Sequence, residues 1–472
     1  MTITKAPNLR CFNNRVGEMK NSLNVSQFKK QLHGKKVAVL GIGVSNIPLI
    51  KILSQYGATV IARDKKTREQ LGGIANELSN IGVRLVLGAD YLENLDEKLI
   101  FRTPGLKINT PQLVEAKKNG AEITSEMEVF FRLCPAKIIA VTGSDGKTTT
   151  TTLIYKILSE AGYKCHVGGN IGKPLLCDVE SISAEDKVIL ELSSFQLQTM
   201  ITSPHIAVVT NVTPNHLDYH ETFDEYIKSK ENIYLHQISC DKLVVNSDNK
   251  ITKGFISKAK GEVITFGASA DSNITISNNN ICINGLPVLN CNDILLSGAH
   301  NKENYMAAIG AVWGAADSSA IQKVAKTFAG VEHRIEFVRE IEGVRYYNDS
   351  IATTPSRAAA CLKSFNKKII VIAGGFDKKI PFDTFAHDSV KYAKALILIG
   401  QTAATIKNEV LSLKGEKPQI IMSKTLDDAV LKAKSIAQRG DVVALTPACA
   451  SFDMFDNFEQ RGNHFKKMVM SL

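Results

Sequence analysis

Short apolar runs alternate with helix-like stretches along the whole chain. Runs that are apolar at nearly every position and rich in β-branched residues are typical of strands buried on both faces of a parallel sheet. Most of these runs end in Gly, Ser, Asn, Asp or Thr, as strands do where an open α/β sheet carries its ligand loops. The runs lie at residues 36–43, 137–144, 187–194, 206–212, 242–248, 368–375, 394–400 and 441–448.

One segment has a different pattern. Residues 273–290, NITISNNNICINGLPVLN, alternate polar and apolar positions around a cluster of asparagines, which predicts antiparallel hairpins. Together the patterns predict the α/β class, with three consecutive domains. We expect a polar, frayed N-terminal extension followed by these domains, with limits at 1–34, 35–125, 126–330 and 331–472.

The composition agrees with this picture. The chain has 472 residues, of which 44% are hydrophobic and 22% charged, as in an ordinary soluble globular protein of several domains. It contains no apolar run long enough to span a membrane and no secretory signal. Its nine cysteines form no C-x-x-C pair, which indicates reduced thiols and a cytoplasmic protein.

The charge favours small anionic ligands over nucleic acid. The formal net charge is +10, but the basic residues are spread along the chain. A nucleic-acid interface would gather them on one stretch or face. We therefore expect neither a nucleic acid nor a membrane as partner.

The clearest candidate site is the segment KIIAVTGSDGKTTT, residues 137–150. A buried strand runs into a glycine-containing turn and then a helix, so backbone N–H groups and the helix N-terminus can hold phosphate. Lys147 can reach the outer phosphates, Thr148 can bind Mg²⁺, and Thr149 can contact phosphate. Val141 replaces the first glycine of the strict P-loop pattern, so the loop is a shortened variant. The alternative is a Gly-Lys turn that caps an ordinary helix.

A second, weaker signal lies in VLGIGVSNIPLI, residues 39–50. Gly41 and Gly43 match a dinucleotide-binding turn, but Asn46 replaces its third glycine. Asp64 lies where a second strand would end. The turn either cradles a diphosphate or is only a tight connection between strand and helix.

Eight segments in order resemble the ATP-dependent Mur ligases of peptidoglycan synthesis. They cover about residues 36–465 and are GSDGKTTTT (143–151), GGNIG (168–172), LELSSFQL (190–197), NVTPNHLDYH (211–220), LSGAHNKEN (296–304), EHRIEF (332–337), YNDSIATTP (347–355) and PACASFDMFDNFEQRGNHF (447–465). The last segment is most similar to the glutamate-adding members. The resemblance implies a Rossmann-like UDP-binding domain, a central P-loop ATPase domain and a C-terminal Rossmann-like domain that binds glutamate.

The activity implied is amide formation in a monomeric enzyme. ATP phosphorylates the alanyl carboxylate of UDP-N-acetylmuramoyl-L-alanine to an acyl phosphate, which the amine of glutamate attacks. The cofactors implied are ATP, two Mg²⁺ ions and a carbamate formed from CO₂ on Lys230. The neighbouring Lys228 is the alternative carbamate site, and from the sequence alone an ordinary solvated helix lysine is the simpler interpretation of Lys230.

The resemblance also implies roles for individual residues. Lys147, His216 and Lys230 are the catalytic candidates, and Thr148, Glu191, His216 and Lys230 are the metal candidates. ATP binding is assigned to Gly143, Ser144, Asp145, Gly146, Lys147, Thr148, Thr149, Asn301, Asn304, Arg334 and Asp349. UDP-substrate binding is assigned to Val44, Ser45, Asp64, Gly105 and Asn170, and glutamate binding to Lys378, Ser451, Phe458 and Thr353. Because Arg334 and Asp349 belong to the C-terminal domain, we expect domain closure to gate catalysis.

Two departures leave questions open. The glutamate-adding enzymes usually carry a lysine where NDSIATT has Ile351, so an enzyme specific for L-glutamate is an alternative. The adjacent Lys378 and Lys379 are hard to separate as the glutamate contact.

Other functions fit less well. A diaminopimelate- or lysine-adding ligase is disfavoured by NFEQRGNHF, and folylpolyglutamate synthase would not be expected to carry the first domain. A nicotinamide-dependent dehydrogenase would explain GIGVSN but not the central phosphate loop. A non-catalytic binding protein would be expected to have lost Lys147, Glu191 or His216.

Overall fold

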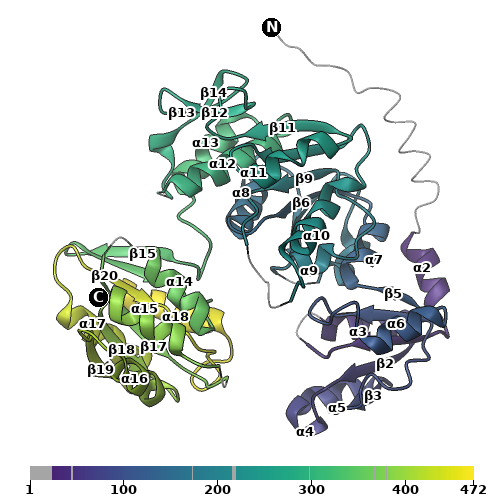
Figure 1. Ribbon diagram of the computed structural model, residues 1–472, viewed down its shortest axis with the longest axis horizontal. Helices are drawn as coiled ribbons and strands as arrows, with labels where there is room; N and C mark the ends of the chain where they lie inside the picture. The colour runs from purple at the N-terminus through teal and green to yellow at the C-terminus, as the bar shows by residue number, and fades with distance from the viewer. Residues whose placement is uncertain are drawn as a thin grey trace. The chain divides into compact units, whose positions relative to one another are not determined.

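The computed structural model describes residues 24–43, 46–172, 174–214, 219–296, 298–365, 367–378 and 380–472. These residues form two compact units, one ending at Phe328 and the other spanning Ala329–Leu472, and each is described by itself. The strands lie in two groups in the first unit and in one group in the second (Figure 1).

The described chain begins with a packed helix. Helix α2, Val25–Leu32, starts at a capping box in which Asn24 and Gln27 bond each other's backbone N–H. Its apolar side chains Phe28 and Leu32 are buried in the core of the first unit. The expectation of a frayed extension is therefore wrong for this helix, because its apolar face is buried in that core; residues 1–23 lie outside the described residues.

The first sheet is parallel, with strand order β3-β2-β1-β4-β5. Helix α6 covers one face through Leu113 and Ala116, while α3 covers the other through Leu49, Ile50 and Leu53. The strands are β1 Lys36–Leu40, β2 Thr59–Asp64, β3 Arg84–Leu87, β4 Leu99–Arg102 and β5 Glu122–Thr124. The helices are α3 Asn46–Gln55, α4 Arg68–Leu71, α5 Gly73–Asn80 and α6 Pro111–Lys118.

The second sheet has the order β14-β13-β12-β11-β10-β9-β6-β8-β7 and is parallel from β7 to β12. One hydrophobic core joins it to the first sheet, so residue 125 separates two sheets but not two compact units. The strands are β6 Lys137–Thr142, β7 Cys165–Gly169, β8 Lys187–Glu191, β9 Ile206–Val209, β10 Lys242–Asn246, β11 Glu262–Phe266, β12 Ile274–Ser277, β13 Asn280–Ile283 and β14 Leu286–Asn290. The helices include α7 Glu126–Leu133, α8 Lys147–Glu160, α9 Ser194–Leu197, α10 Phe223–Leu235, α11 Lys250–Lys253, α12 Ala299–Val312 and α13 Ser318–Thr327.

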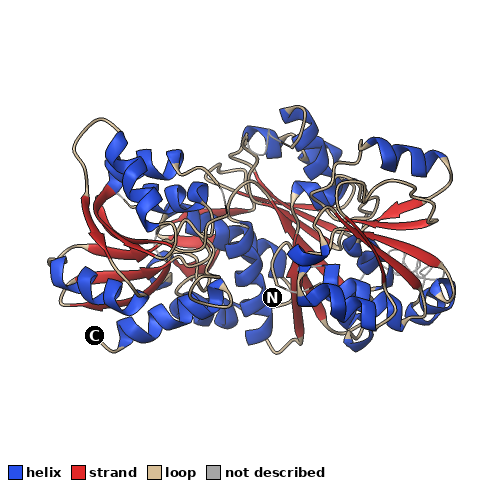
Figure 2. Ribbon diagram, turned by 90° about the horizontal axis from the view of Figure 1, so that it is seen from below, coloured by secondary structure: helices blue, strands red, loops and turns tan. Residues whose placement is uncertain are grey.

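The second unit is built on a sheet of order β15-β16-β20-β17-β18-β19, parallel except for the β15–β16 hairpin. Helices cover both of its faces (Figure 2): α14, α15 and α16 pack on one side and α17 and α18 on the other. The strands are β15 Glu336–Ile341, β16 Val344–Asn348, β17 Ile369–Gly374, β18 Ala393–Ile399, β19 Gln419–Met422 and β20 Val442–Leu445. The helices are α14 Pro355–Lys363, α15 Asp383–Tyr392, α16 Ala403–Ser412, α17 Leu426–Ile436 and α18 Phe458–Met470.

These elements confirm the predicted α/β class. Each of the apolar runs contains a strand of a parallel sheet, and residues 273–290 form the antiparallel strands β12, β13 and β14. The β12–β13 turn has Asn278 and Asn279 at φ 47° and 58°, the left-handed conformation that a tight hairpin requires. Within the part of the chain that the structure describes, each helix is too short or too polar to cross a bilayer.

Candidate active site

The phosphate-loop candidate lies between β6 and α8, at the carboxyl edge of the second sheet. Gly143 and Gly146 have φ of 153° and 78°. A methyl group on Gly143 would lie 1.9 Å from Thr210 Oγ1, and one on Gly146 would lie 2.3 Å from Asn304 Oδ1. Both positions therefore require glycine, for backbone conformation and for space.

Residues after β9 hold this loop in place. Asn211 accepts hydrogen bonds from the backbone of Ser144 and Asp145, each at 2.9 Å, and Thr210 Oγ1 donates to Asp145 O at 2.6 Å. Ser144 Oγ lies 2.9 Å from the hydroxyl of Tyr226. Sequence reasoning did not select Thr210, Asn211 or Tyr226. Thr210 and Asn211 could have been selected from the sequence, because they directly follow a predicted buried strand.

Two polar side chains meet on Glu191, the last residue of β8. Thr148 Oγ1 donates to Glu191 Oε2 and Asn170 Nδ2 donates to Glu191 Oε1, both at 2.7 Å. Glu191 is only 2% exposed, and its neighbours supply hydroxyl and amide oxygens. Carboxylate, hydroxyl and amide oxygens are the ligand types that suit Mg²⁺. The predicted metal residues Thr148 and Glu191 thus lie together, as does Asn170, which was assigned to the UDP substrate.

Two lysines converge on one carbonyl of the loop. Lys147 Nζ donates to Gly143 O at 3.0 Å and to Ser144 O at 2.9 Å, while Lys230 Nζ donates to Gly143 O at 2.8 Å. Lys230 lies on α10 and is 1% exposed. Burial, and then the charge of Lys147, lowers the pKa of Lys230 well below its ordinary value.

The neighbouring lysine has different surroundings. The side chain of Lys228 is 71% exposed and forms an ion pair of 2.6 Å with Asp224, one turn away on the same helix. The interpretation of Lys230 as a solvated helix lysine is therefore wrong. Lys228 is the solvated lysine of this helix.

The predicted helix that carries the ATP candidates Asn301 and Asn304 is α12. The two side chains are buried and bonded to each other, with Asn304 Nδ2 donating to Asn301 Oδ1 at 3.1 Å. Asn304 Oδ1 also accepts from Thr150 Oγ1 at 3.3 Å, which brings α12 against the first turns of α8. Thr149 is half-buried in the first turn of α8.

Two of the UDP candidates, Asp64 and Gly105, lie at the carboxyl edge of the first sheet. Asp64 ends β2 and accepts from the backbone N–H of Ile42 at 2.5 Å and of Lys66 at 2.9 Å. Its carboxylate thus supports the glycine turn after β1. Gly105 lies in an exposed turn after β4, the other neighbour of β1. Three further candidates, Val44, Ser45 and His216, lie outside the described residues.

The second unit brings Asp349 and Arg334 into one region. Asp349, just after β16, accepts from Thr446 Oγ1 at 2.9 Å and from the backbone N–H of Ile335 at 3.2 Å. Burial raises the pKa of Asp349 to about 6. Arg334 is exposed, next to Ile335 in the chain.

The glutamate candidates surround the carboxyl edge of the same sheet. Lys378 Nζ donates to Thr353 O at 3.4 Å. Ser451 is buried in the loop after β20, and Phe458 begins α18, where its carbonyl accepts from Ser350 Oγ at 2.8 Å. Lys379 lies outside the described residues.

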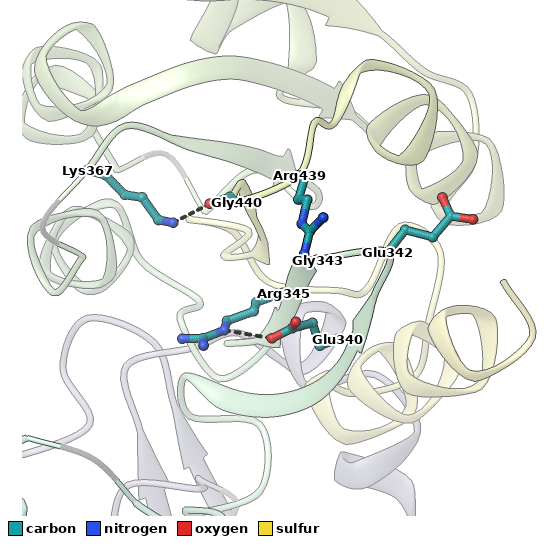
Figure 3. A pocket seen from close by; sticks show the side chains of 7 residues that line it. All are labelled: Glu340, Glu342, Gly343, Arg345, Lys367, Arg439 and Gly440. Atoms are coloured by element: carbon teal, nitrogen blue, oxygen red, sulfur yellow. Dashed lines mark hydrogen bonds and ion pairs between the residues drawn. The ribbon is translucent and has the colours of Figure 1, made fainter.

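A cavity of about 670 Å³ lies at the opposite, amino-terminal edge of this sheet (Figure 3). It is bordered by Arg345, Lys367 and Arg439, and by residues just before β16 and β20. Arg345 is paired with Glu340 at 2.9 Å, and Lys367 donates to Gly440 O. No predicted site residue borders this cavity, so the chemistry of the candidate site lies elsewhere.

Comparison with protein families matches the chain in three consecutive parts. Residues 35–125 match the Mur ligase MurD-like N-terminal domain, residues 141–312 the Mur ligase middle domain, and residues 333–449 the Mur ligase glutamate ligase domain. These matches agree with the predicted domain order, while the limits set from the sequence stay a prediction.

Related proteins match over nearly the whole length. The protein named UDP-N-acetylmuramoylalanine--D-glutamate ligase from Clostridium botulinum is 50% identical over 455 residues, 95% of this chain and 99% of that protein. Proteins of the same name from Clostridium kluyveri and Acetivibrio thermocellus are 50% and 49% identical, over 94% and 95% of this chain and 99% of each relative.

Solved structures share the fold at lower identity. UDP-N-acetylmuramate-alanine ligase from Thermotoga maritima has a TM-score of 0.53 at 18% identity, covering 93% of this chain and all of that one. The UDP-N-acetylmuramoylalanyl-D-glutamyl-2,6-diaminopimelate--D-alanyl-D-alanyl ligase from Acinetobacter baumannii has a TM-score of 0.51 at 15% identity. The match covers 92% of this chain and 93% of that one. The domain matches, the relatives at half identity and the shared fold lead to one conclusion: this chain belongs to the Mur ligase family.

Proposed function

We propose that this protein is the ATP-dependent ligase that adds D-glutamate to UDP-N-acetylmuramoyl-L-alanine through an acyl phosphate. The observation that carries the proposal is the convergence of Lys147 and buried Lys230 on the loop carbonyl of Gly143, beside Glu191. Two cations beside a phosphate-binding turn suit phosphoryl transfer, and the relatives at half identity carry the D-glutamate ligase name.

The loop is suited to an anionic nucleotide. Backbone N–H groups at the N-terminus of α8 can bind phosphate oxygens, and the helix dipole adds positive potential there. Lys147 supplies a cation next to the same oxygens. Because the reacting groups are all anionic, these fixed positive groups lower the cost of bringing them together.

Thr148 and Glu191 are the described residues that would hold Mg²⁺, together with the undescribed His216. Bound there, the metal would supply positive charge that offsets the transferred phosphoryl group. Asn170 orients the Glu191 carboxylate through its 2.7 Å hydrogen bond, as partners of metal-binding side chains commonly do.

We propose Lys230 as the site of the carbamate. Its neutral amine attacks CO₂, a C–N bond forms, one C–O π bond opens, and a proton is released. This reaction needs the unprotonated amine, and burial favours that form at neutral pH. The product is an anion beside Glu191, which can serve as a further metal ligand.

The amino acid is assigned to the second unit, where Lys378 can pair with a side-chain carboxylate and Ser451 and Phe458 lie at the same sheet edge. Ile351 replaces the usual lysine but contacts the fold through its backbone, with its N–H donating to His333 O at 3.1 Å. We propose that the pocket accepts D-glutamate without the charge at position 351. The ATP assignments of Arg334 and Asp349 also stay proposals.

The assay that tests the function is phosphate release from ATP with UDP-N-acetylmuramoyl-L-alanine, with D-glutamate and L-glutamate supplied separately. We expect release that depends on both the UDP substrate and D-glutamate. Release with L-glutamate alone would contradict the stereochemical assignment. If phosphate is released neither with D-glutamate nor with L-glutamate, glutamate is not the substrate.

The setting follows from the substrates. ATP and UDP-linked sugars are cytoplasmic metabolites, so we propose that the enzyme acts in the cytoplasm in the synthesis of peptidoglycan precursors. We also propose that it works as a monomer.

A further inference from the structure

Arg461, on α18, is a buried cation that none of the assignments above uses. It is 0% exposed, and it is the largest of the fully buried side chains that the structure describes. Burying a guanidinium is costly unless its N–H groups are satisfied. Its surroundings therefore have to explain why it is there.

The guanidinium joins two loops at the carboxyl edge of the second unit's sheet. Nη2 donates to Ser350 O at 2.9 Å and to Cys449 O at 3.1 Å, Nη1 donates to Ala450 O at 3.1 Å, and Nε donates to Ser350 Oγ at 3.0 Å. Ser350 follows β16, whereas Cys449 and Ala450 follow β20. The planar fork of arginine reaches both loops at once, which a lysine ammonium on a single stem does not.

A third loop packs against the same group. A methyl group on Gly375, directly after β17, would lie 3.3 Å from Arg461 Nη1 and 2.4 Å from Ala450 O. Strands β16, β20 and β17 are neighbours in the sheet. Arg461 therefore lies where the loops of three adjacent strands meet.

These loops carry the glutamate candidates. Ser451 directly follows the two carbonyls that Arg461 binds, and Thr353 follows Ser350 in a tight turn with Thr353 N donating to Ile351 O at 2.8 Å. Phe458 lies one turn before Arg461 on α18, and its carbonyl accepts from Ser350 Oγ. A change at Arg461 would thus move the elements that carry three of the four candidates.

No carboxylate is hydrogen-bonded to Arg461, although the charge of Asp453 lies close enough to favour its cationic form. Its four acceptors are uncharged oxygens, and burial lowers its pKa only to about 10, so the group is charged at neutral pH. The charge also acts on Lys378, the fourth candidate. Burial lowers the pKa of Lys378, and repulsion from the charge of Arg461 lowers it further. In a region of low dielectric such a charge attracts anions more strongly than it would in water.

We propose that Arg461 is a positioning residue of the amino-acid pocket: it fixes the loops of Ser451 and Thr353, and its charge attracts the carboxylates of the incoming amino acid. This proposal rests on the assignment of glutamate to the second unit. It adds a role for a residue that touches no substrate.

The test compares Arg461→Lys and Arg461→Met with a matched control, Arg439→Met. Arg439 belongs to the same unit but borders the cavity at the opposite edge of the sheet, where its side chain packs toward Gly343 (Figure 3). The KM values for D-glutamate and for UDP-N-acetylmuramoyl-L-alanine are measured for each variant, with circular dichroism to check folding.

We expect the KM for D-glutamate to rise about tenfold in Arg461→Lys, because backbone carbonyls lose their donors, and further in Arg461→Met, which also loses the charge. The KM for the UDP substrate, assigned to the first unit, should change less than twofold. Arg439→Met should leave both values unchanged. Arg461→Lys keeps most of the volume and the charge, so the comparison does not depend on Arg461→Met folding.

An unchanged KM for D-glutamate in folded Arg461→Lys would overturn the proposal, as would equal increases in both KM values, which indicate a general loss of structure. Failure of the proposed function has a different signature. In that case the unmodified enzyme itself would show no release of phosphate that depends on D-glutamate.

Discussion

Lys228 and Lys230 are near neighbours on α10 with opposite surroundings. Lys230 is buried among Thr142, Gly143 and the ring of Tyr226, whose centroid lies 4.7 Å from Nζ. Lys228 points to solvent and pairs with Asp224. Of the two amines only the buried one has a lowered pKa, which favours the unprotonated form that the proposed carbamate would need.

We expect Lys230→Ala to reduce phosphate release about 100-fold or more, because it removes the anion that the carbamate would supply. Acetate or propionate should restore part of the activity by occupying the space of the lost side chain. The measurement is phosphate release with and without the added carboxylate. Lys228→Ala is the matched control and should retain activity; loss of activity there, with full activity in Lys230→Ala, would move the carbamate to Lys228.

The burial of Asp349 predicts how the stability of the second unit depends on pH. Its pKa is raised from an ordinary 3.8 to about 6, so between these values the folded protein holds a proton that the unfolded chain has lost. The contribution to stability is therefore fully present below about pH 4 and is lost as pH rises through about 6. The shift corresponds to about 3 kcal/mol.

Asp349→Asn should accordingly become more stable relative to the unmodified protein by up to about 3 kcal/mol between pH 4 and pH 7. Urea unfolding followed by circular dichroism at both pH values measures this difference. Glu416→Gln serves as the control, because the Glu416 side chain is 90% exposed. A constant difference between Asp349→Asn and the unmodified protein at the two pH values would show that burial does not raise this pKa.

The start of α8 shows how far an element can be predicted from sequence. The run from β6 through Gly143 and Gly146 to Lys147 was expected, because glycine spacing and the change from strand to helix pattern are local features. The partners of the loop were not expected. Thr210 and Asn211 reach it only because β9 lies beside β6 in the sheet.

Gly146 and Gly162 flank α8, and alanine at either position strains the backbone, but only alanine at 146 would also contact a neighbouring side chain. Comparing Gly146→Ala with Gly162→Ala therefore separates the effect of strain from the effect of contact. Both glycines have positive φ, 78° and 89°, so each alanine should cost about 1–2 kcal/mol of stability. Only the methyl group at 146 meets a neighbour, Asn304 Oδ1, whereas the space around Gly162 is open.

We therefore expect Gly146→Ala to raise the KM for ATP about tenfold, the scale of one disturbed polar contact, and Gly162→Ala to leave it unchanged. Steady-state kinetics at varied ATP concentration measures the effect, and thermal unfolding reports the strain that both variants share. Equal KM values for the two variants would mean that contact between Gly146 and Asn304 has no part in nucleotide binding.

At the scale of the whole molecule, the two compact units each have their own core. One core of the first unit extends from α2 through both of its sheets, and a smaller one lies between α6 and the first sheet. The second unit has separate cores on the two faces of its sheet. The chain has a single tryptophan, Trp313, which lies in the first unit and is half-buried. Its fluorescence therefore reports on that unit.

We expect urea unfolding to give one transition by Trp313 fluorescence and a broader or two-step transition by circular dichroism, because both units contribute to the latter. Arg461→Lys should lower the urea midpoint of the second unit only, so the transition seen by circular dichroism should shift while the Trp313 fluorescence transition stays in place. Coincident transitions by both probes, shifted together by Arg461→Lys, would indicate that the units unfold as one.

The sequence by itself determined strand β1 of the first sheet, strands β6, β8, β9 and β10 of the second and β17, β18 and β20 of the third. It also determined the glycine loop, the helix that follows it and the Asn-turn hairpins. Each depends on the order of apolar residues or on backbone conformations that few residue types adopt, and both are local. It also carried the family motifs, which placed most of the candidate residues.

Tertiary structure decided which charged groups are buried. Lys230 bonds Gly143, 87 positions earlier, and Arg461 bonds Ser350, 111 positions earlier. Helix α2, whose composition suggested a loose end, is packed because the core of the first unit buries Phe28 and Leu32. Burial depends on neighbours that are distant in the chain, so the pattern around Lys230 or Arg461 could not show that their charges lie inside the protein.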